Sequence, residues 1–153
     1  MKIYVASSWQ NSHQPAVVTI LRGMGHQVYD FRNPEPGNTG FHWSEIDPDW
    51  ESWSPIQYRS ALNHPLAERG HASDMAALES CEACLLVLPS GRSASWEFGY
   101  ACGKGKRGAV FMPEPCAPEL MYRGYEIMVS FNGLDIWGRT LAREEPTVVE
   151  SHP

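Results

Sequence analysis

Three side chains from separate parts of the sequence could act on one substrate: Glu97, Asp74 and Tyr4. Glu97 lies near the start of a predicted helix that follows the small, hydroxyl-rich turn at residues 89–93. The start of a helix carries partial positive charge and free N–H groups, so we expect it to suit an anion and to hold the Glu97 carboxylate ionised. An ionised carboxylate in a ligand cleft can be a base, a nucleophile or an acceptor for a hydroxyl. An acidic residue in a first helical turn is also common for stability alone, contributing about 0.3–1 kcal/mol.

Asp74 and Tyr4 strengthen the catalytic interpretation of Glu97. Asp74 lies on a predicted helix in a stretch otherwise rich in Ala and Leu, where it is either a second reactive carboxylate or a solvated or capping residue. Tyr4 is the one hydrogen-bonding side chain inside the first predicted strand. It is either a packed aromatic residue or a hydroxyl that reaches a ligand or carboxylate.

Small polar residues follow the first and third predicted strands and are candidates for substrate binding. They can equally serve as turn and helix-cap residues. Asp30, at the end of the second strand, is a further candidate. The candidates in the two turns are Ser7, Ser8, Ser90, Gly91, Arg92 and Ser93.

The elements that must position these residues alternate between strand and helix. Apolar runs predict strands at residues 3–6, 27–30, 84–88, 109–112 and 126–130. Helical spacing predicts helices at 15–24, at 57–64, from 65 or 72 to 81, from 93 or 94 to 103 or 105, and at 134–143. This order is typical of a doubly wound, flavodoxin-like or Rossmann-like α/β sandwich, so we expect one domain at 1–143 with a five-stranded, mainly parallel sheet. Residues 144–153 show no period and are predicted to be a flexible tail.

Length and composition exclude several classes of protein. A chain of 153 residues holds one domain with a sizeable core. The net charge of −6 argues against a protein that binds the nucleic-acid backbone. No apolar run has the ~18 residues that a membrane span needs, and the N-terminus lacks the apolar core of a secretory signal, so we expect a cytoplasmic protein.

Two further features leave alternatives open. Cys81 and Cys84 form a CxxC without a second ligand pair and before a strand, which favours packing thiols over a metal or redox site. The segment at residues 31–54 is a long loop with three tryptophans, Trp43, Trp50 and Trp53. These rings either cap one end of the sheet or cover a ligand, where they could stack on a base.

Taken together, several segments resemble the nucleoside 2-deoxyribosyltransferase-like family. The resemblance rests on Tyr4 in a first strand, on residues 74–78 leading through Cys81 to an apolar strand, and on the run from Gly91 to Tyr100. Within that run, Glu97-Phe98-Gly99 is the most distinctive part. The element order of residues 2–131 fits the family.

The resemblance implies cleavage of an N-glycosidic bond without a metal or other cofactor. Glu97 would be the nucleophile that forms a covalent glycosyl-enzyme, and Tyr4 would orient it. Asp74 would hydrogen-bond the nucleobase and handle its proton. This is the double displacement of retaining glycosidases, in which one carboxyl group is ionised and the other carries a proton.

The turn at residues 89–93 leaves the substrate open. Transferases of the family tend to carry an acidic residue there, whereas this turn is more similar to that of the related nucleoside 5′-monophosphate N-hydrolases, whose serines bind phosphate. We therefore keep three hypotheses: transfer of a (deoxy)ribosyl group between nucleobases, hydrolysis of a nucleoside 5′-monophosphate, and a non-catalytic nucleotide-binding module. The family is commonly homo-oligomeric with sites completed across subunits, to which Met121 and Asn132 would contribute.

Overall fold

The computed structural model describes residues 1–143, so the predicted tail at 144–153 lies outside the described residues. Five parallel strands form one sheet in the order β2-β1-β3-β4-β5. The strands are β1 (Lys2–Ala6), β2 (Gln27–Asp30), β3 (Ala83–Val87), β4 (Arg107–Phe111) and β5 (Glu126–Met128). The helices are α1 (Gln14–Gly23), α2 (Pro55–Ala61), α3 (Pro65–Ser80), α4 (Arg92–Gly103) and α5 (Phe131–Arg143). The predicted sheet is confirmed, and among the described residues all its pairings are parallel.

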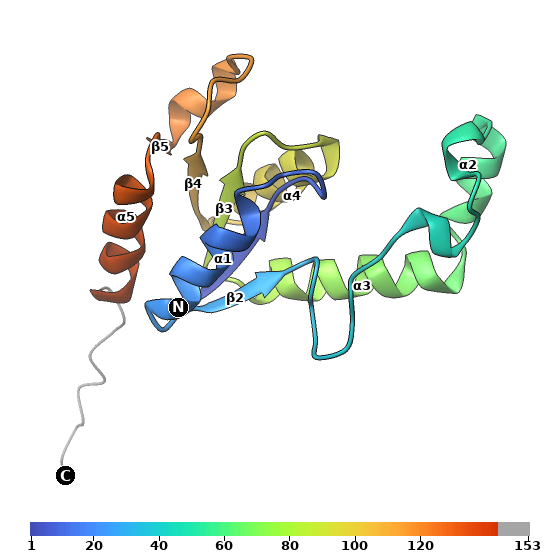
Figure 1. The fold of residues 1–153 in the computed structure, drawn as a ribbon, viewed down its shortest axis with the longest axis horizontal. Coiled ribbons are helices and arrows are strands. Elements are labelled where there is room, and N and C mark those ends of the chain that lie inside the picture. Colours follow the sequence, from blue (N-terminus) through green and yellow to red (C-terminus); the bar gives the residue numbers. More distant parts are fainter. Residues whose placement is uncertain (144–153) are drawn as a thin grey trace, which may run out of the picture.

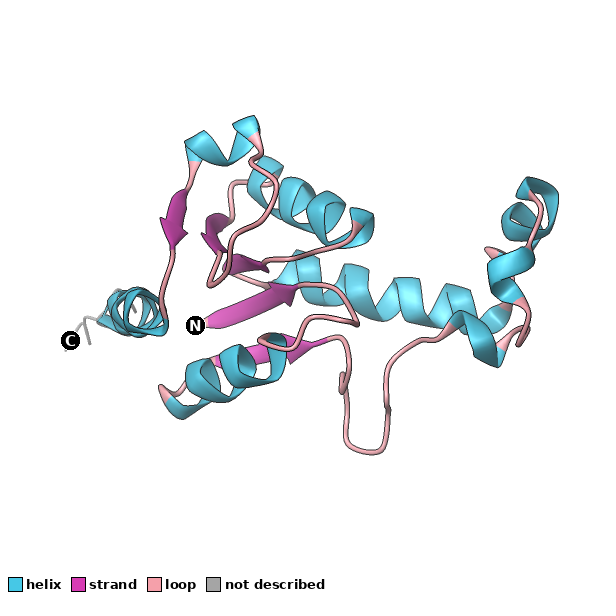
Figure 2. Cartoon of the chain, turned by 45° about the horizontal axis from the view of Figure 1, so that its top comes forward, coloured by secondary structure: helices cyan, strands magenta, loops and turns pink. Residues whose placement is uncertain are grey.

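Helices cover both faces of the sheet because neighbouring residues of a strand point to opposite faces. On one face, Val5 of β1 and Leu85 of β3 pack in a cluster with α1 and α5. On the other face, Tyr4 and Leu86 pack in a second cluster with α3 and α4. Figure 2 shows the strands between the helices of these two layers. The fully buried β3 has the near-continuous apolar sequence that a central parallel strand requires.

Local sequence signals account for both ends of α1. Pro15 lies in the first turn of α1, where its missing N–H costs no hydrogen bond. Gly25 follows that helix with a φ of 88°, a conformation that glycine adopts without steric penalty. The helix α4 starts at Arg92, slightly before the predicted start.

The segment between β2 and α3 forms an arm that extends from the sheet. Figure 1 shows α3 running beyond the sheet edge and carrying α2 at its far end. In the arm, Trp43 makes edge contacts with Phe41, Trp53 and Tyr58 at ring separations of 4.7–5.9 Å. Phe41 in turn lies against Gly70 of α3. The arm's rings therefore pack with one another and on α3.

The loops after β1 and β3 are joined at the point where the strand order reverses. The Ser7 hydroxyl donates to the Val87 carbonyl at 2.9 Å. The Asn11 side chain donates to the Val87 and Pro89 carbonyls at 3.3 and 2.9 Å. In doubly wound folds ligands bind at this reversal, so the fold places its expected ligand edge between these two loops.

Candidate active site

Four ionisable side chains meet on the face of the sheet that α3 and α4 cover. Tyr4 and Tyr29 are register partners on β1 and β2, and their rings stack with centroids 5.1 Å apart. Asp74 comes from α3 and Glu97 from α4. The charges of both carboxylates act on the Tyr4 hydroxyl, so two helices and two strands contribute to one cluster. The structure thus brings together all three predicted catalytic residues.

The environment of Glu97 differs from the sequence-based expectation. Glu97 is the sixth residue of α4, beyond its first turn. Burial raises the pKa of Glu97, the neighbouring charge of Asp74 raises it further, and the contact with Tyr4 lowers it, with the result at about 7. The helix N-terminus therefore does not hold this carboxylate ionised as predicted, because the cost of desolvation is larger.

Asp74 is held by a residue that sequence reasoning missed. The Tyr29 hydroxyl donates to Asp74 Oδ1 at 2.8 Å and lies 2.9 Å from Ser73 Oγ. Burial raises the pKa of Asp74, and the Tyr29 hydrogen bond and the nearby His71 lower it in part. In the sequence, Tyr29 looked like an ordinary strand residue. The signal that could have identified Tyr29 was its position opposite the candidate residue Tyr4 once the two strands are paired in parallel.

The Tyr4 hydroxyl is completely buried and makes no hydrogen bond within residues 1–143. It nevertheless lies close enough to the Glu97 carboxylate for a polar contact that lowers the pKa of Glu97. A buried polar group without a partner is costly, and such groups concentrate at functional sites. Burial and the two carboxylates raise the pKa of Tyr4 far above its ordinary value, which keeps the hydroxyl protonated as a donor.

The predicted binding residues of the two turns lie at the expected edge of the sheet. Gly91 is the N-cap of α4 in an extended conformation and has no side-chain cap, and Arg92 and Ser93 are exposed in the first turn. Ser90 is half-buried just before them. Ser8 Oγ accepts from the Gln10 amide at 3.2 Å within its own loop.

Asp30 lies at the same edge but on the other face of the sheet. Its carboxylate accepts from the side chains of Gln14 at 2.7 Å and Asn33 at 3.1 Å and from the Arg32 amide at 3.0 Å. Gln14 belongs to α1, so the structure separates Asp30 from the Glu97 and Asp74 carboxylates.

Three other predicted binding residues lie outside the carboxylate cluster. Trp43 belongs to the aromatic cluster of the arm. Met121 is 73% exposed in a short 3-10 helix before β5, and Asn132 is exposed in the first turn of α5.

The thiols of Cys81 and Cys84 are buried in the apolar cluster between the sheet, α3 and α4, as expected of packing residues. Within residues 1–143, no three His, Cys, Asp or Glu side chains gather in a way that could hold a metal ion. In the same range, no helix combines the length and apolar character that a membrane crossing requires.

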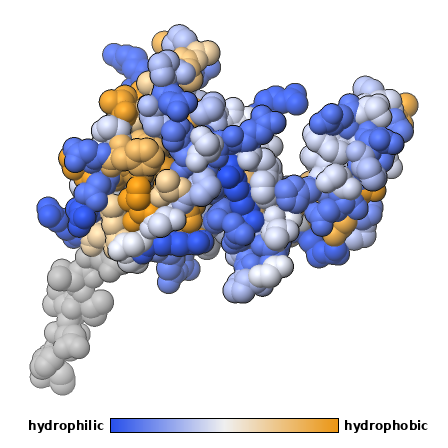
Figure 3. Space-filling model, in the orientation of Figure 1, coloured by the Kyte–Doolittle hydropathy of each residue, from blue (hydrophilic) through white to orange (hydrophobic). Residues whose placement is uncertain are grey.

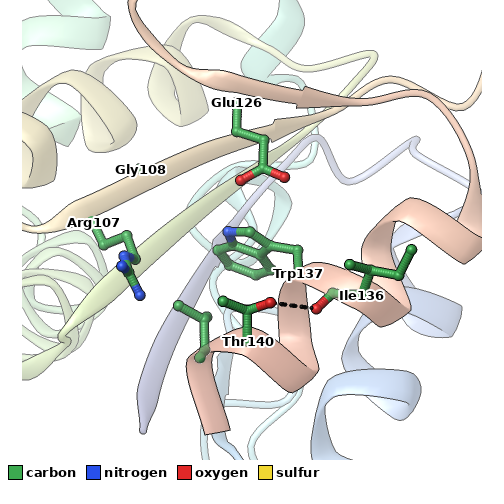
Figure 4. A pocket seen from close by; sticks show the side chains of 7 residues that line it. Arg107, Gly108, Glu126, Ile136, Trp137 and Thr140 are labelled. Carbon is green, nitrogen blue, oxygen red and sulfur yellow. Dashed lines mark hydrogen bonds between the residues drawn. The ribbon is translucent and has the colours of Figure 1, made fainter. Parts of the chain in front are cut away.

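Two surface hollows lie away from the cluster. One, of about 190 Å³, lies between β4, β5 and α5 and is lined by residues that include Arg107, Glu126 and Trp137 (Figure 4). The other, of about 380 Å³, lies along residues 33–39. Neither is lined by Tyr4, Asp74 or Glu97. The shared burial and charge of the carboxylates, rather than the shape of the surface, mark the candidate site.

The strand order and the two helical layers define a doubly wound, flavodoxin-like α/β protein. No protein-family model and no curated protein matches the chain. Among solved structures, it is similar to a 2-deoxyribosyltransferase from the psychrotolerant bacterium Bacillus psychrosaccharolyticus, described as a biocatalyst for the synthesis of antiviral and antitumoral nucleosides. The TM-score is 0.63 over 88% of this chain and 90% of that one, at 19% sequence identity. The resemblance seen in the sequence is therefore confirmed at the level of the fold.

Proposed function

We propose that the protein cleaves the N-glycosidic bond of a (deoxy)nucleoside and transfers the sugar to another nucleobase. One observation carries this proposal: Glu97 and Asp74 meet on one face of the sheet, closely enough that the charge of Asp74 raises the pKa of Glu97. Two half-buried carboxyl groups whose charges are coupled share protons, so the pair passes through a state with a single proton. That state supplies one nucleophile and one acid. The fold shared with a 2-deoxyribosyltransferase supports the same choice.

The chemistry is a double displacement. A Glu97 oxygen attacks C1′ of the sugar, the bond from C1′ to the base nitrogen breaks, and its electron pair stays on the base. Asp74 gives its proton to the departing base, which leaves a glycosyl ester on Glu97 and an ionised Asp74. A nitrogen of the second base then attacks C1′ and displaces Glu97, and Asp74 takes up the proton of that base. The cycle restores both carboxyl groups.

Base exchange tests the proposal directly. The protein is incubated with a deoxynucleoside and a different free base, and the new nucleoside is followed by chromatography. Glu97→Gln should reduce exchange at least about a thousandfold, because a neutral amide is a poor nucleophile. Glu68→Gln, an exposed glutamate in the first turn of α3, is the matched control and should leave the rate unchanged. Absence of both exchange and base release over a broad panel would overturn the proposal.

A second candidate, hydrolysis of a nucleoside 5′-monophosphate, is favoured by the start of α4. Its first N–H groups have no side-chain cap, and Arg92 is exposed beside them, an arrangement that suits a phosphate. Release of base from the monophosphate without an acceptor base would distinguish hydrolysis from transfer. If Arg92→Ala raises KM equally for nucleoside and monophosphate, the phosphate assignment fails.

We also propose that the active form is a homo-oligomer. Apolar surface gathers over β4, β5 and α5 (Figure 3), where Ile127 and Val129 are 42% and 64% exposed beside the edge strand. Exposed apolar patches of this kind often mark protein interfaces. Sedimentation should show a dimer or larger species that Val129→Lys dissociates. A monomeric wild type with full activity would contradict this assembly.

A further inference from the structure

We propose that Tyr29 is a positioning residue for Asp74, fixing one carboxyl oxygen so that the other faces the departing nucleobase. This inference rests on the proposed function for its catalytic meaning. Its structural basis is the Tyr29 hydroxyl, which lies between Ser73 and Asp74.

The hydrogen bonds around Tyr29 have one consistent direction. Tyr29 has a single hydroxyl proton, which it donates to Asp74 Oδ1 at 2.8 Å. Ser73 Oγ, 2.9 Å away, must therefore be the donor to the Tyr29 oxygen. Ser73 thus supports Tyr29, and Tyr29 supports Asp74.

This chain of donors makes the two oxygens of Asp74 unequal. Oδ1 is occupied by the Tyr29 donor, whereas no donor among residues 1–143 reaches Oδ2. When Asp74 is protonated, its proton therefore resides on Oδ2. That oxygen is the one able to donate to a base nitrogen and to receive the proton back.

The sheet, rather than the helix that carries Asp74, sets the position of the Tyr29 ring. Tyr29 stacks on the wholly buried Tyr4 at an interplanar angle of 21°. Tyr29 therefore ties the carboxyl group on α3 to β2 and, through the stacked Tyr4, to β1. A carboxyl group held in this way needs little reorganisation when it transfers a proton.

The effect on protonation is specific to one ionisation step. Four titratable groups face Asp74: Tyr29 from β2, Tyr4 from β1, Glu97 from α4 and His71 from its own helix. The Tyr29 hydrogen bond lowers the pKa of Asp74. The charge of Asp74 raises the pKa of Glu97, so the first proton leaves mainly from Asp74 and the second from Glu97. The reactive form, with Glu97 ionised and the proton on Asp74, is the less populated arrangement of the same single-proton state, and its fraction follows the same two ionisation steps. Loss of the Tyr29 hydroxyl therefore raises the pKa of the first ionisation, that of Asp74, and leaves the pKa of the second unchanged.

Tyr29→Phe tests this inference because it keeps the stacked ring and removes the hydroxyl. The rate of base exchange is measured as a function of pH. Its rise on the acid side (the acid limb) should move to higher pH, while its fall on the alkaline side (the alkaline limb) stays in place. At a pH on the wild-type acid limb, the rate relative to the optimum should fall about tenfold, as expected for the loss of a hydrogen bond to a charged group. Ser73→Ala should shift the same limb in the same direction by less.

A matched control is available in Tyr100, whose hydroxyl also donates to a carboxylate, that of Glu79, at an exposed position. Tyr100→Phe should leave both limbs unchanged. An NMR titration of carboxyl-labelled aspartate follows Asp74 without requiring activity, and its pKa should be higher in Tyr29→Phe than in the wild type. If the Asp74 titration and the acid limb are the same in both proteins, the inference is overturned. If the wild type shows no base exchange but the pKa of Asp74 is still higher in Tyr29→Phe than in the wild type, only the proposed reaction is overturned and the positioning role of Tyr29 stands.

Discussion

Tyr4 and Tyr29 lie opposite each other on adjacent parallel strands, stack face to face, and contact different carboxylates. Tyr29 donates to Asp74, and Tyr4 lowers the pKa of Glu97. Each carboxyl group of the candidate pair therefore has its own tyrosine. The two tyrosines have opposite effects on where the single proton of the pair resides. Tyr29 lowers the pKa of Asp74 and so favours the proton on Glu97, whereas Tyr4 lowers the pKa of Glu97 and so favours the proton on Asp74.

Tyr4→Phe is expected to move the alkaline limb of the rate profile. Without the Tyr4 contact the pKa of Glu97 rises, so the loss of its proton shifts to higher pH, while the acid limb, governed by Asp74, stays in place. The rate at the optimum should fall about tenfold, because the reactive arrangement needs an ionised Glu97. The measurement is the pH dependence of base exchange. An alkaline limb that stays where it is would contradict the assignment of Tyr4 to Glu97.

At a pH where Glu97 is protonated, the same variant should not lower the free energy of unfolding. The Tyr4 hydroxyl is buried without a hydrogen bond within the described chain, so its removal loses no such bond. Urea unfolding at pH 5, where the Glu97 carboxyl group of the folded protein is protonated, should give a value equal to or above that of the wild type. A large loss of stability would show that the hydroxyl has a structural partner.

Glu97→Gln should change how stability depends on pH. In the folded protein the pKa of Glu97 is raised from 4.5 to about 7, so the native state binds more protons than the unfolded chain between these values. The free energy of unfolding therefore falls as pH rises through that window, by about 3 kcal/mol at most. Glutamine does not ionise, so the variant should match the wild type near pH 4.5 and exceed it at pH 8. Parallel pH profiles for the two proteins would contradict the burial of an ionisable Glu97.

Gly40→Ala should destabilise the base of the arm. Gly40 has a φ of 79°, and an added Cβ would lie 2.3 Å from the Phe31 carbonyl oxygen and 2.9 Å from the Trp9 ring. Gly37 has a similar φ of 82° with nothing within 4 Å. Both alanines incur about 1–2 kcal/mol for the left-handed backbone, and Gly40→Ala adds about 1–3 kcal/mol of steric clash. Thermal unfolding with Gly37→Ala as the control separates these contributions. If the two variants lose the same free energy of unfolding, the packing of Trp9 on Gly40 is contradicted.

The sequence was sufficient to predict the succession of strands and helices along the chain and the three candidate residues Tyr4, Asp74 and Glu97 that the structure brings together. Strands such as β3 are continuous apolar runs, and Pro15 and Gly25 bracket α1, so local chemistry marks these elements. The arm was not predictable, because its rings find their partners on one another and on Gly70 through tertiary contacts. The pKa of Glu97 was predicted in the wrong direction, since a helix start can be seen in a sequence but the burial of one carboxylate cannot.

The most direct test of the account is to detect a covalent sugar on Glu97. The protein is mixed with a deoxynucleoside in the absence of an acceptor base, quenched in acid and digested, and the peptide that contains residues 91–100 is analysed by mass spectrometry. We expect this peptide to gain the mass of one deoxyribosyl group, located on Glu97 by fragmentation and absent in Glu97→Gln. Base exchange without any adduct on this peptide, or an adduct on another residue, would contradict Glu97 as the nucleophile.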